Sequence, residues 1–267
     1  MSAPSQAPSR SSAVIAPDVS SIVTEDDTPV DNIYSERQQR LLLTTLYANW
    51  AGPPPEEDGL PRTFVAKANV GVFGTATDPP VVPDVLVSLD VSFGEDVLAK
   101  ENRTYFVWIF GKSPDLVLEV VSNREGEELG KKKRKYRNLH VPSYVVWDPA
   151  GHLGDTAFQA FELRGSLYVK KRDTFFESLG LGLVPWEGTF EGCTSRWHRW
   201  VDAEGKLLPT GTDRAQQAEE LTRQADAQAL LERERAQQAD ERAQQERERA
   251  TRLAEKLRAL GIDPDAS

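Results

Sequence analysis

Apolar residues recur along the chain at two spacings, one typical of helices and one of strands. After Ser35-Glu36-Arg37-Gln38, apolar residues follow at helical spacing as far as Trp50, which predicts a helix over about 35–49 that ends before Gly52-Pro53. Apolar runs of strand length come next, at 64–72, 82–89, 104–110 and 114–122. The run at 114–122 is the most apolar, so we expect a central strand there and a peripheral one at 104–110.

The second part of the pattern completes a mixed α/β fold. Residues 125–139 read as a helix, and 143–148 read as a buried strand that Pro149 ends. Residues 157–163 and 167–171 read as a hairpin. The order helix, strands, helix, strand predicts a crossover that joins the strands at 114–122 and 143–148.

Composition divides the chain into three zones. Residues 1–31 are rich in Ser, Pro, Ala and Asp, which predicts a disordered N-terminal tail. Residues 32–205 hold all six tryptophans and all ten phenylalanines, and form the predicted globular domain. Residues 213–260 lack aromatics, proline and glycine, and consist largely of strong helix formers.

The third zone carries a heptad repeat dominated by alanine. One seam position holds Ala215, Thr222, Ala229, Ala236, Ala243, Ala250 and Leu257, and the other holds Ala218, Ala225, Glu232, Ala239, Glu246, Leu253 and Leu260. Such a seam buries little area per turn, so a solvated single helix and a coiled coil both fit it. A coiled coil would make the protein a homo-oligomer, and Gly261 would end the helix.

The overall composition excludes several classes of protein. With 39% hydrophobic residues the chain can build a core, and its apolar runs are too short for a membrane span. The N-terminus does not have the pattern of a secretory signal, and the single Cys193 permits no intrachain disulfide, so we expect a cytoplasmic protein. The net charge of -10 argues against a protein that coats nucleic acid, although it leaves room for a local basic site.

Two acidic residues lie where apolar residues are expected. Asp84 follows Pro83 at the start of a strand, and Glu119 interrupts the apolar run LVLEVV. A buried carboxylate needs a cation or hydrogen-bond donors, so we interpret both as site residues. The structural alternative for Glu119 is an edge position that faces water.

A basic run, KKKRKYR, lies on the helix that follows. At about 100° per residue, Lys132 falls inside the apolar stripe of that helix. Lys133 falls at the margin of the stripe, and Lys131 points outward. We therefore expect Lys132 to face the sheet that carries Glu119, although a lysine whose stem lies along the apolar surface would show the same pattern.

Two carboxylates and an inward lysine are the parts of a hydrolytic metal site. Asp84 and Glu119 would hold Mg²⁺, or Mn²⁺ in its place, through oxygen ligands. Lys132 would orient a water or stabilise the charge that develops on phosphorus. The surrounding lysines and arginines would contact DNA phosphates, which position DNA without reading its sequence.

The segments VPDVLVSLDV and PDLVLEVVSNREGEELGKKKRKYRNLHVPSYVVWDP resemble the Uma family of endonucleases, a branch of the PD-(D/E)XK, restriction-endonuclease-like superfamily. The resemblance covers roughly residues 30–205. It implies that Pro83-Asp84 is the PD motif, that Glu119 is the second acid, and that Lys132, four residues before a tyrosine, replaces the usual lysine at position 121. Glu36 resembles an additional acid of some superfamily members.

The sequence thus predicts a metal-dependent DNA endonuclease with catalytic Asp84, Glu119 and Lys132. One alternative is a catalytically silent nuclease fold that binds DNA or serves as a scaffold assembled through its coiled coil. Another is a structural protein whose coiled coil is the working part. A glycosidase could use two acids but would not need Lys132. Cys193 and His198 are expected to be incidental rather than a nucleophile pair.

Overall fold

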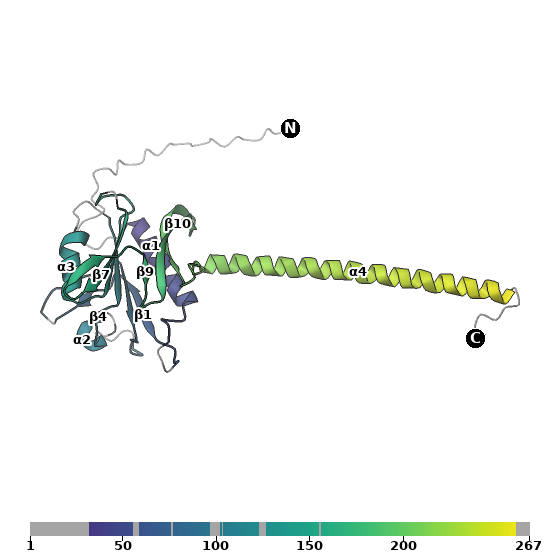
Figure 1. Cartoon of the computed structure of the whole chain (residues 1–267), viewed down its shortest axis with the longest axis horizontal. Coiled ribbons are helices and arrows are strands. Elements are labelled where there is room, and N and C mark those ends of the chain that lie inside the picture. The colour runs from purple at the N-terminus through teal and green to yellow at the C-terminus, as the bar shows by residue number, and fades with distance from the viewer. Residues whose placement is uncertain are drawn as a thin grey trace, which may run out of the picture. The chain divides into compact units, whose positions relative to one another are not determined.

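The computed structural model describes residues 32–259, except 56–58, 76, 97–101, 103, 123–126 and 155 (Figure 1). The predicted tail at 1–31 lies outside the described residues, as do Leu260 and Gly261. The chain divides after Leu208 into two compact units, which are described separately.

A six-stranded mixed sheet forms the centre of the first unit. In spatial order its strands are β1 (Phe64–Ala68), β3 (Val85–Leu89), β5 (Leu116–Val120), β6 (Ser143–Trp147), β7 (Phe158–Arg164) and β8 (Leu167–Lys170). Strand β5 pairs antiparallel with β3 and parallel with β6, so the run at 114–122 is central and a crossover joins it to β6. The predicted mixed α/β class is therefore confirmed.

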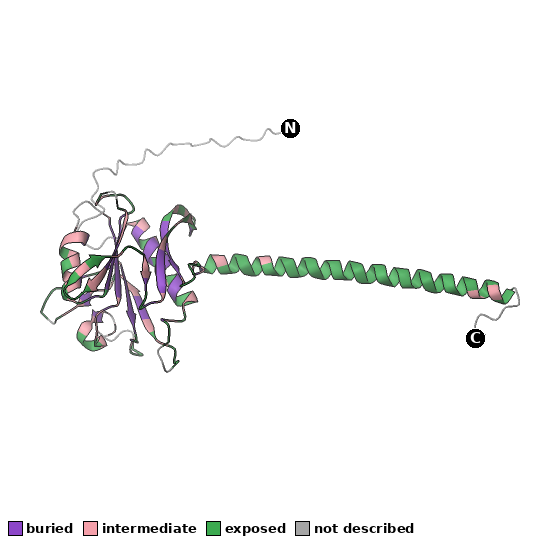
Figure 2. Ribbon diagram, in the orientation of Figure 1, coloured by how far each residue is buried: buried purple, intermediate pink, exposed green. Residues whose placement is uncertain are grey.

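Helices cover both faces of this sheet, because successive side chains of a strand point to opposite faces. Helix α1 (Ile33–Asn49) packs Leu42 and Leu46 against Val85, Leu118 and other residues of one face. On the other face, Tyr136 of α3 (Lys133–Asn138) packs with Leu86, Val117 and Tyr144. Figure 1 shows the sheet between α1 and α3, and Figure 2 shows that the buried residues of this unit concentrate in the sheet.

The expected strand at 104–110 is wrong in its second half. Only β4 (Tyr105–Phe106) is extended, and it pairs in parallel with β2 (Val72–Phe73) to form a small separate sheet. The next four residues form a helical turn, α2 (Val107–Phe110), which ends at Gly111 in a left-handed conformation. This turn stacks the Phe110 ring on Tyr105 with centroids 4.4 Å apart, whereas residues five apart in a strand would point to opposite faces.

The helix expected at 125–139 has two parts. It begins as a π-helical segment, η2 (Glu128–Lys132), and continues as α3. The Lys132 N–H donates to the carbonyl of Glu127, five residues earlier, at 2.9 Å. Residues 125 and 126 of the expected helix lie outside the described residues.

A second, three-stranded sheet was not expected from the sequence. It consists of β9 (Phe175–Phe176), β10 (Leu181–Phe190) and β11 (Cys193–Val201) in antiparallel pairing. Hydrogen bonds tie β11 to α1: the Gln38 side chain bonds both backbone groups of His198, and Trp200 Nε1 donates to the Leu42 carbonyl. Glycine and proline inside β10 argue against a strand in the sequence, which is why the pattern gave no sign of it.

The second unit contains a single long helix, α4 (Gly211–Ala259). Thr210 and Asp213 form a reciprocal cap, because each side chain accepts a hydrogen bond from the backbone N–H of the other. None of its 49 residues is buried. The predicted C-terminal helix is confirmed, whereas its pairing with a second copy stays a prediction. None of the helices in the described ranges is long and apolar enough to cross a bilayer.

Deleting residues 213–267 should lower the mass of the particle in solution to that of a monomer and leave the first unit folded. The heptad seam is the only assembly element that the sequence indicates, and α4 contributes no buried residue. Light scattering gives the mass, and the thermal midpoint should move by less than about 2 °C. If the full-length and truncated proteins contain the same number of chains per particle, α4 does not assemble the protein.

Candidate active site

Asp84 lies at the entry to β3, where the β3–β5 ladder ends. The register pairs Val85 with Leu118, so the next position places Asp84 opposite Glu119. Residues directly opposite in an antiparallel pair point to the same face of the sheet. The Asp84 carboxylate extends the ladder, because its Oδ2 accepts a hydrogen bond from the Val120 N–H at 2.5 Å.

Helix α1 reaches this carboxylate through a residue that the sequence did not single out. Gln39, only 3% exposed, donates from Nε2 to Asp84 Oδ1 at 2.9 Å and accepts from Asn69 Nδ2 at 3.0 Å. Glu36 is half-exposed and forms an ion pair with Arg40 at 3.0 Å. The α1 side chain that contacts Asp84 is therefore Gln39 rather than Glu36. Its signal was available, because Gln39 precedes Leu42 and Leu46 on the apolar stripe at positions i, i+3 and i+7.

Glu119 is buried, with 1% of its side chain exposed, and both of its oxygens accept hydrogen bonds from one helix. Lys132 Nζ donates to Oε2 at 2.8 Å, and the Tyr136 hydroxyl donates to Oε1 at 2.5 Å. The edge position with Glu119 facing water is thus wrong. Nothing in the sequence analysis assigned Tyr136 a contact with Glu119, although its spacing of four residues from Lys132 places the two on one helical face.

The electrostatics of this cluster keep its two donors protonated. Burial disfavours the Lys132 ammonium, but the charge of Glu119 and its hydrogen bond outweigh burial and raise the pKa of Lys132 above its ordinary value. Burial, together with the nearby Glu119 charge, raises the pKa of Tyr136 well above its usual range. Lys132 is therefore expected to carry a positive charge at physiological pH.

The other lysines of the run point elsewhere. Lys131 is 56% exposed and pairs with Glu127 at 2.9 Å. Lys133 Nζ lies 3.3 Å from the centre of the Phe161 ring, and burial lowers the pKa of this lysine. Of the three neighbouring lysines, Lys132 is the one that the structure brings to Glu119.

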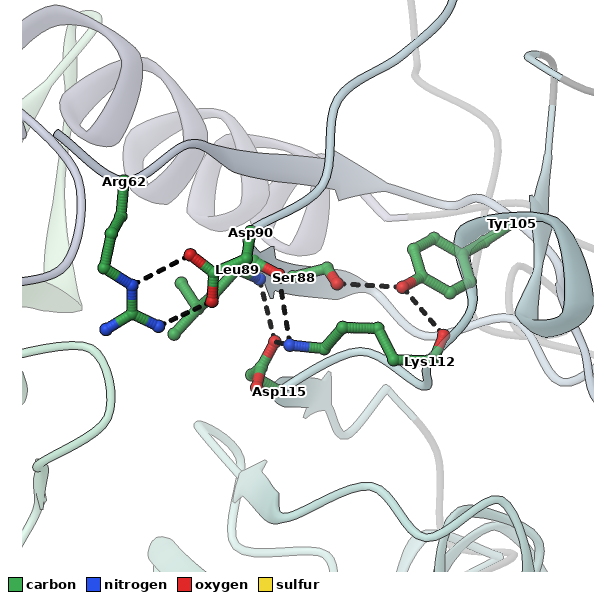
Figure 3. Close-up of polar contacts among 7 residues, drawn as sticks. All are labelled: Arg62, Ser88, Leu89, Asp90, Tyr105, Lys112 and Asp115. Atoms are coloured by element: carbon green, nitrogen blue, oxygen red, sulfur yellow. Dashed lines mark hydrogen bonds and ion pairs between the residues drawn. The ribbon is translucent and has the colours of Figure 1, made fainter. Parts of the chain in front are cut away.

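A second Pro-Asp dipeptide provides an internal comparison for Asp84. Asp115 follows Pro114 at the other end of the β3–β5 pair, and its Oδ2 accepts from the Leu89 N–H at 2.8 Å, as Asp84 accepts from Val120. Figure 3 shows its surroundings: Lys112 pairs with Asp115 at 2.7 Å, and Arg62 makes a bidentate contact with Asp90. Both aspartates thus close an end of the ladder, but Asp84 alone lies opposite Glu119.

Cys193 and His198 do not resemble a nucleophile pair. His198 is 2% exposed and packs against the rings of Trp147 and Phe158, with centroids 4.2 and 4.4 Å away. Burial lowers the pKa of His198 to about 3, so the imidazole is neutral at physiological pH. Cys193 packs against the buried cluster of Leu41, Phe190 and Trp197.

The carboxylate oxygens of Asp84 and Glu119 are ligands of the kind that a hard divalent cation prefers. In the part of the chain that the structure describes, no three His, Cys, Asp or Glu side chains are grouped as a metal site. Mg²⁺ is commonly held by one or two carboxylates, with water and substrate phosphate completing its shell. Each carboxylate oxygen here accepts a described hydrogen bond and keeps further lone-pair capacity, so two carboxylates fit such a cation.

Comparison with known proteins identifies a family for this chain. The family model of Uma2, described as "Putative restriction endonuclease", matches residues 12–171, which is more than half of the 267-residue chain. The matched range includes Asp84, Glu119 and Lys132. No curated protein matches the sequence. The mixed sheet between helices agrees with a restriction-endonuclease-like fold, and the chain belongs to the Uma2 family.

Proposed function

We propose that the protein is a metal-dependent DNA endonuclease that hydrolyses phosphodiester bonds, with Asp84, Glu119 and Lys132 as its catalytic residues. The observation that carries the proposal is the ion pair between Lys132 and the buried Glu119, at the position where Asp84 lies opposite. Membership of the Uma2 family supports a nuclease activity. The metal and the DNA substrate are part of our proposal.

Asp84 and Glu119 are the residues that would hold Mg²⁺ or Mn²⁺. When bound, such an ion polarises a phosphoryl oxygen and lowers the pKa of a coordinated water. Gln39 and the Val120 N–H hold the Asp84 carboxylate in place, and Tyr136 holds Glu119. These contacts fix the orientation of both acids before substrate arrives, which is what an efficient site requires.

Lys132 supplies a permanent positive charge to this site. Its ammonium stays protonated, so it is suited to stabilise the negative charge that develops on the phosphoryl oxygens in the transition state. Its side chain remains 30% exposed, which leaves it accessible to a substrate phosphate.

Basic residues of the same helix are placed to contact the DNA backbone. Lys131 and Arg134 are exposed, and Lys135 and Arg137 are partly exposed. Because phosphate contacts carry no sequence information, this surface supports binding to DNA in general. The overall negative charge of the protein keeps such binding local.

The two Pro-Asp dipeptides allow a matched test of the proposed activity. Supercoiled plasmid is incubated with the full-length protein in Mg²⁺, Mn²⁺ or EDTA, and nicked product is quantified. We expect nicking with either metal and none with EDTA. Asp84→Asn should reduce the rate by about 10²-fold, because the amide binds a cation poorly. Asp115→Asn, which alters the equivalent ladder contact, should retain the wild-type rate within about threefold.

Two results would contradict the proposal. Binding of DNA without cleavage in any metal would favour the catalytically silent alternative. Equal losses of nicking rate in Asp84→Asn and Asp115→Asn would show that Asp84 only stabilises the end of the β3–β5 pair.

A further inference from the structure

A third acid lies beside the candidate site, and the proposed function gives it no role. Glu128, the first residue of η2, is 6% exposed, and its Oε2 is buried without a hydrogen-bond partner. Its backbone carbonyl accepts from the Tyr144 hydroxyl at 2.7 Å, which fixes this end of the helix against β6. A buried carboxylate oxygen without a hydrogen-bond partner is energetically unfavourable, so its presence calls for an explanation.

The charges of Glu128, Lys132 and Glu119 act on one another. Burial raises the pKa of Glu128, the Lys132 ammonium lowers it, and the Glu119 carboxylate raises it again. In turn, Glu128 is among the acids that raise the pKa of Lys132. Glu128 and Lys132 are the first and last residues of the π-helical segment η2, a spacing close to one turn of such a helix.

A divalent cation bound by Glu119 would place a second positive charge beside the Lys132 ammonium. Lys132 donates to Glu119 Oε2 at 2.8 Å, and a cation bound by Glu119 would repel the ammonium. Once displaced, the ammonium needs another acceptor in a partly buried place. The unpartnered Oε2 of Glu128, on the same helical segment, is the candidate acceptor.

We propose that Glu128 is a positioning residue, the alternative acceptor of the Lys132 ammonium when Glu119 binds a divalent cation. The proposal rests on the proposed function, since it assigns Glu119 to the cation. It predicts two arrangements of Lys132, with the ammonium on Glu119 in the metal-free protein and on Glu128 in the loaded one.

The first test needs neither metal nor DNA, because Glu119→Gln removes the carboxylate that holds Lys132. Thermal midpoints of the full-length protein are measured at pH 8 for wild type, Glu128→Gln, Glu119→Gln and the double variant. In the wild-type background, Glu128→Gln should raise the midpoint by about 3 °C, since it removes a buried charge. In the Glu119→Gln background it should lower the midpoint by a similar amount, because Lys132 then depends on Glu128.

The increase in thermal midpoint that Glu128→Gln causes in the wild-type background should depend on pH. An acid whose pKa is raised by folding destabilises the folded state above that pKa, and this penalty disappears when both states are protonated. The gain from Glu128→Gln should therefore shrink as the pH falls through the raised pKa toward the ordinary value of glutamate. Glu128→Met serves as a second variant that removes the carboxylate. A change of the same sign in both Glu119 backgrounds overturns the proposal.

The second test follows Mn²⁺ affinity by the paramagnetic resonance of the free ion. Glu128→Gln should weaken Mn²⁺ binding about tenfold in the wild-type background and less than twofold in a Lys132→Met background, because the effect acts through the lysine. An equal loss in both backgrounds would make Glu128 a direct ligand and overturn the proposal. If the wild type binds no Mn²⁺, the proposed function fails, and the reversal of sign in the first test still decides whether Glu128 accepts Lys132.

Discussion

Glu119→Gln should reduce metal-dependent nicking of plasmid by about 10³-fold, the largest loss that we expect from a change of a single functional group. The amide keeps the size of the side chain but removes the charge that would hold a cation. In the variant, the amide nitrogen replaces one of the two oxygens that accept hydrogen bonds from Lys132 and Tyr136, so one of these bonds is lost. The free energy of unfolding should therefore fall by about 1–2 kcal/mol. Single-turnover cleavage with saturating enzyme measures the rate, and thermal melting measures the stability.

Glu162→Gln is the control for this substitution. Glu162 is also a strand residue of the large sheet, but it is partly exposed and pairs with Arg164. Its replacement should leave the cleavage rate within about twofold and the stability within about 0.5 kcal/mol of wild type. A Glu119→Gln protein that is folded and cleaves at the wild-type rate would remove Glu119 from the mechanism.

Lys132→Met should lower both the cleavage rate and the stability. The rate should fall by about 10²-fold, because the substitution removes a charge that acts mainly in the transition state. The free energy of unfolding should fall by about 3 kcal/mol, because Glu119 stays buried and loses its cation. Helical geometry alone predicts that folding survives the loss of Lys132, since Leu129 and Tyr136 still pack; the burial of Glu119 changes this expectation.

A double variant separates the two effects of Lys132. Glu119→Gln combined with Lys132→Met removes both charges and should recover most of the stability, while activity stays absent. Lys131→Met is the matched control, since Lys131 is exposed and its surface pair with Glu127 is screened by solvent, so its loss should leave the stability close to that of wild type. A Lys132→Met protein with normal cleavage, beside a Lys133→Met protein without it, would move the catalytic role to the neighbour.

Local patterns determined much of the fold. A strand buried on both faces reads as a continuous apolar run, so β5 and β6 were recognisable, and β5 was expected to be central. Its one charged residue, Glu119, stood out for the same reason. The uniform composition of residues 213–260 likewise predicted α4, because helix propensity is a property of short segments.

The helical spacing of residues predicted that Lys132 faces the sheet. The prediction holds even though part of the helix is π-helical rather than α-helical. The π-helical segment ends at Lys132, so the path from Lys132 to Tyr136 runs through regular α-helix. The angle around the helix axis between Lys132 and Leu129 therefore differs from that of an α-helix, whereas the angle between Lys132 and Tyr136 is that of an α-helix.

Other features depended on contacts between segments far apart in the chain. The sequence contains Gln39, but only the packing of α1 on the sheet brings it to Asp84, 45 residues away. The sheet of β9–β11 is built from pairings that its glycines and proline obscure, and the turn at Val107–Phe110 brings the Phe110 ring onto Tyr105.

The sequence by itself determined which residues carry unusual chemistry, because an acid in an apolar strand and a lysine in an apolar stripe conflict with their local patterns. Only the tertiary structure decided how those charges are compensated. Both oxygens of Glu119 accept hydrogen bonds from a single helix, whereas Oε2 of Glu128 has no hydrogen-bond partner. Compensation of a buried charge depends on distances of about 3 Å between segments, and a linear pattern does not contain those distances.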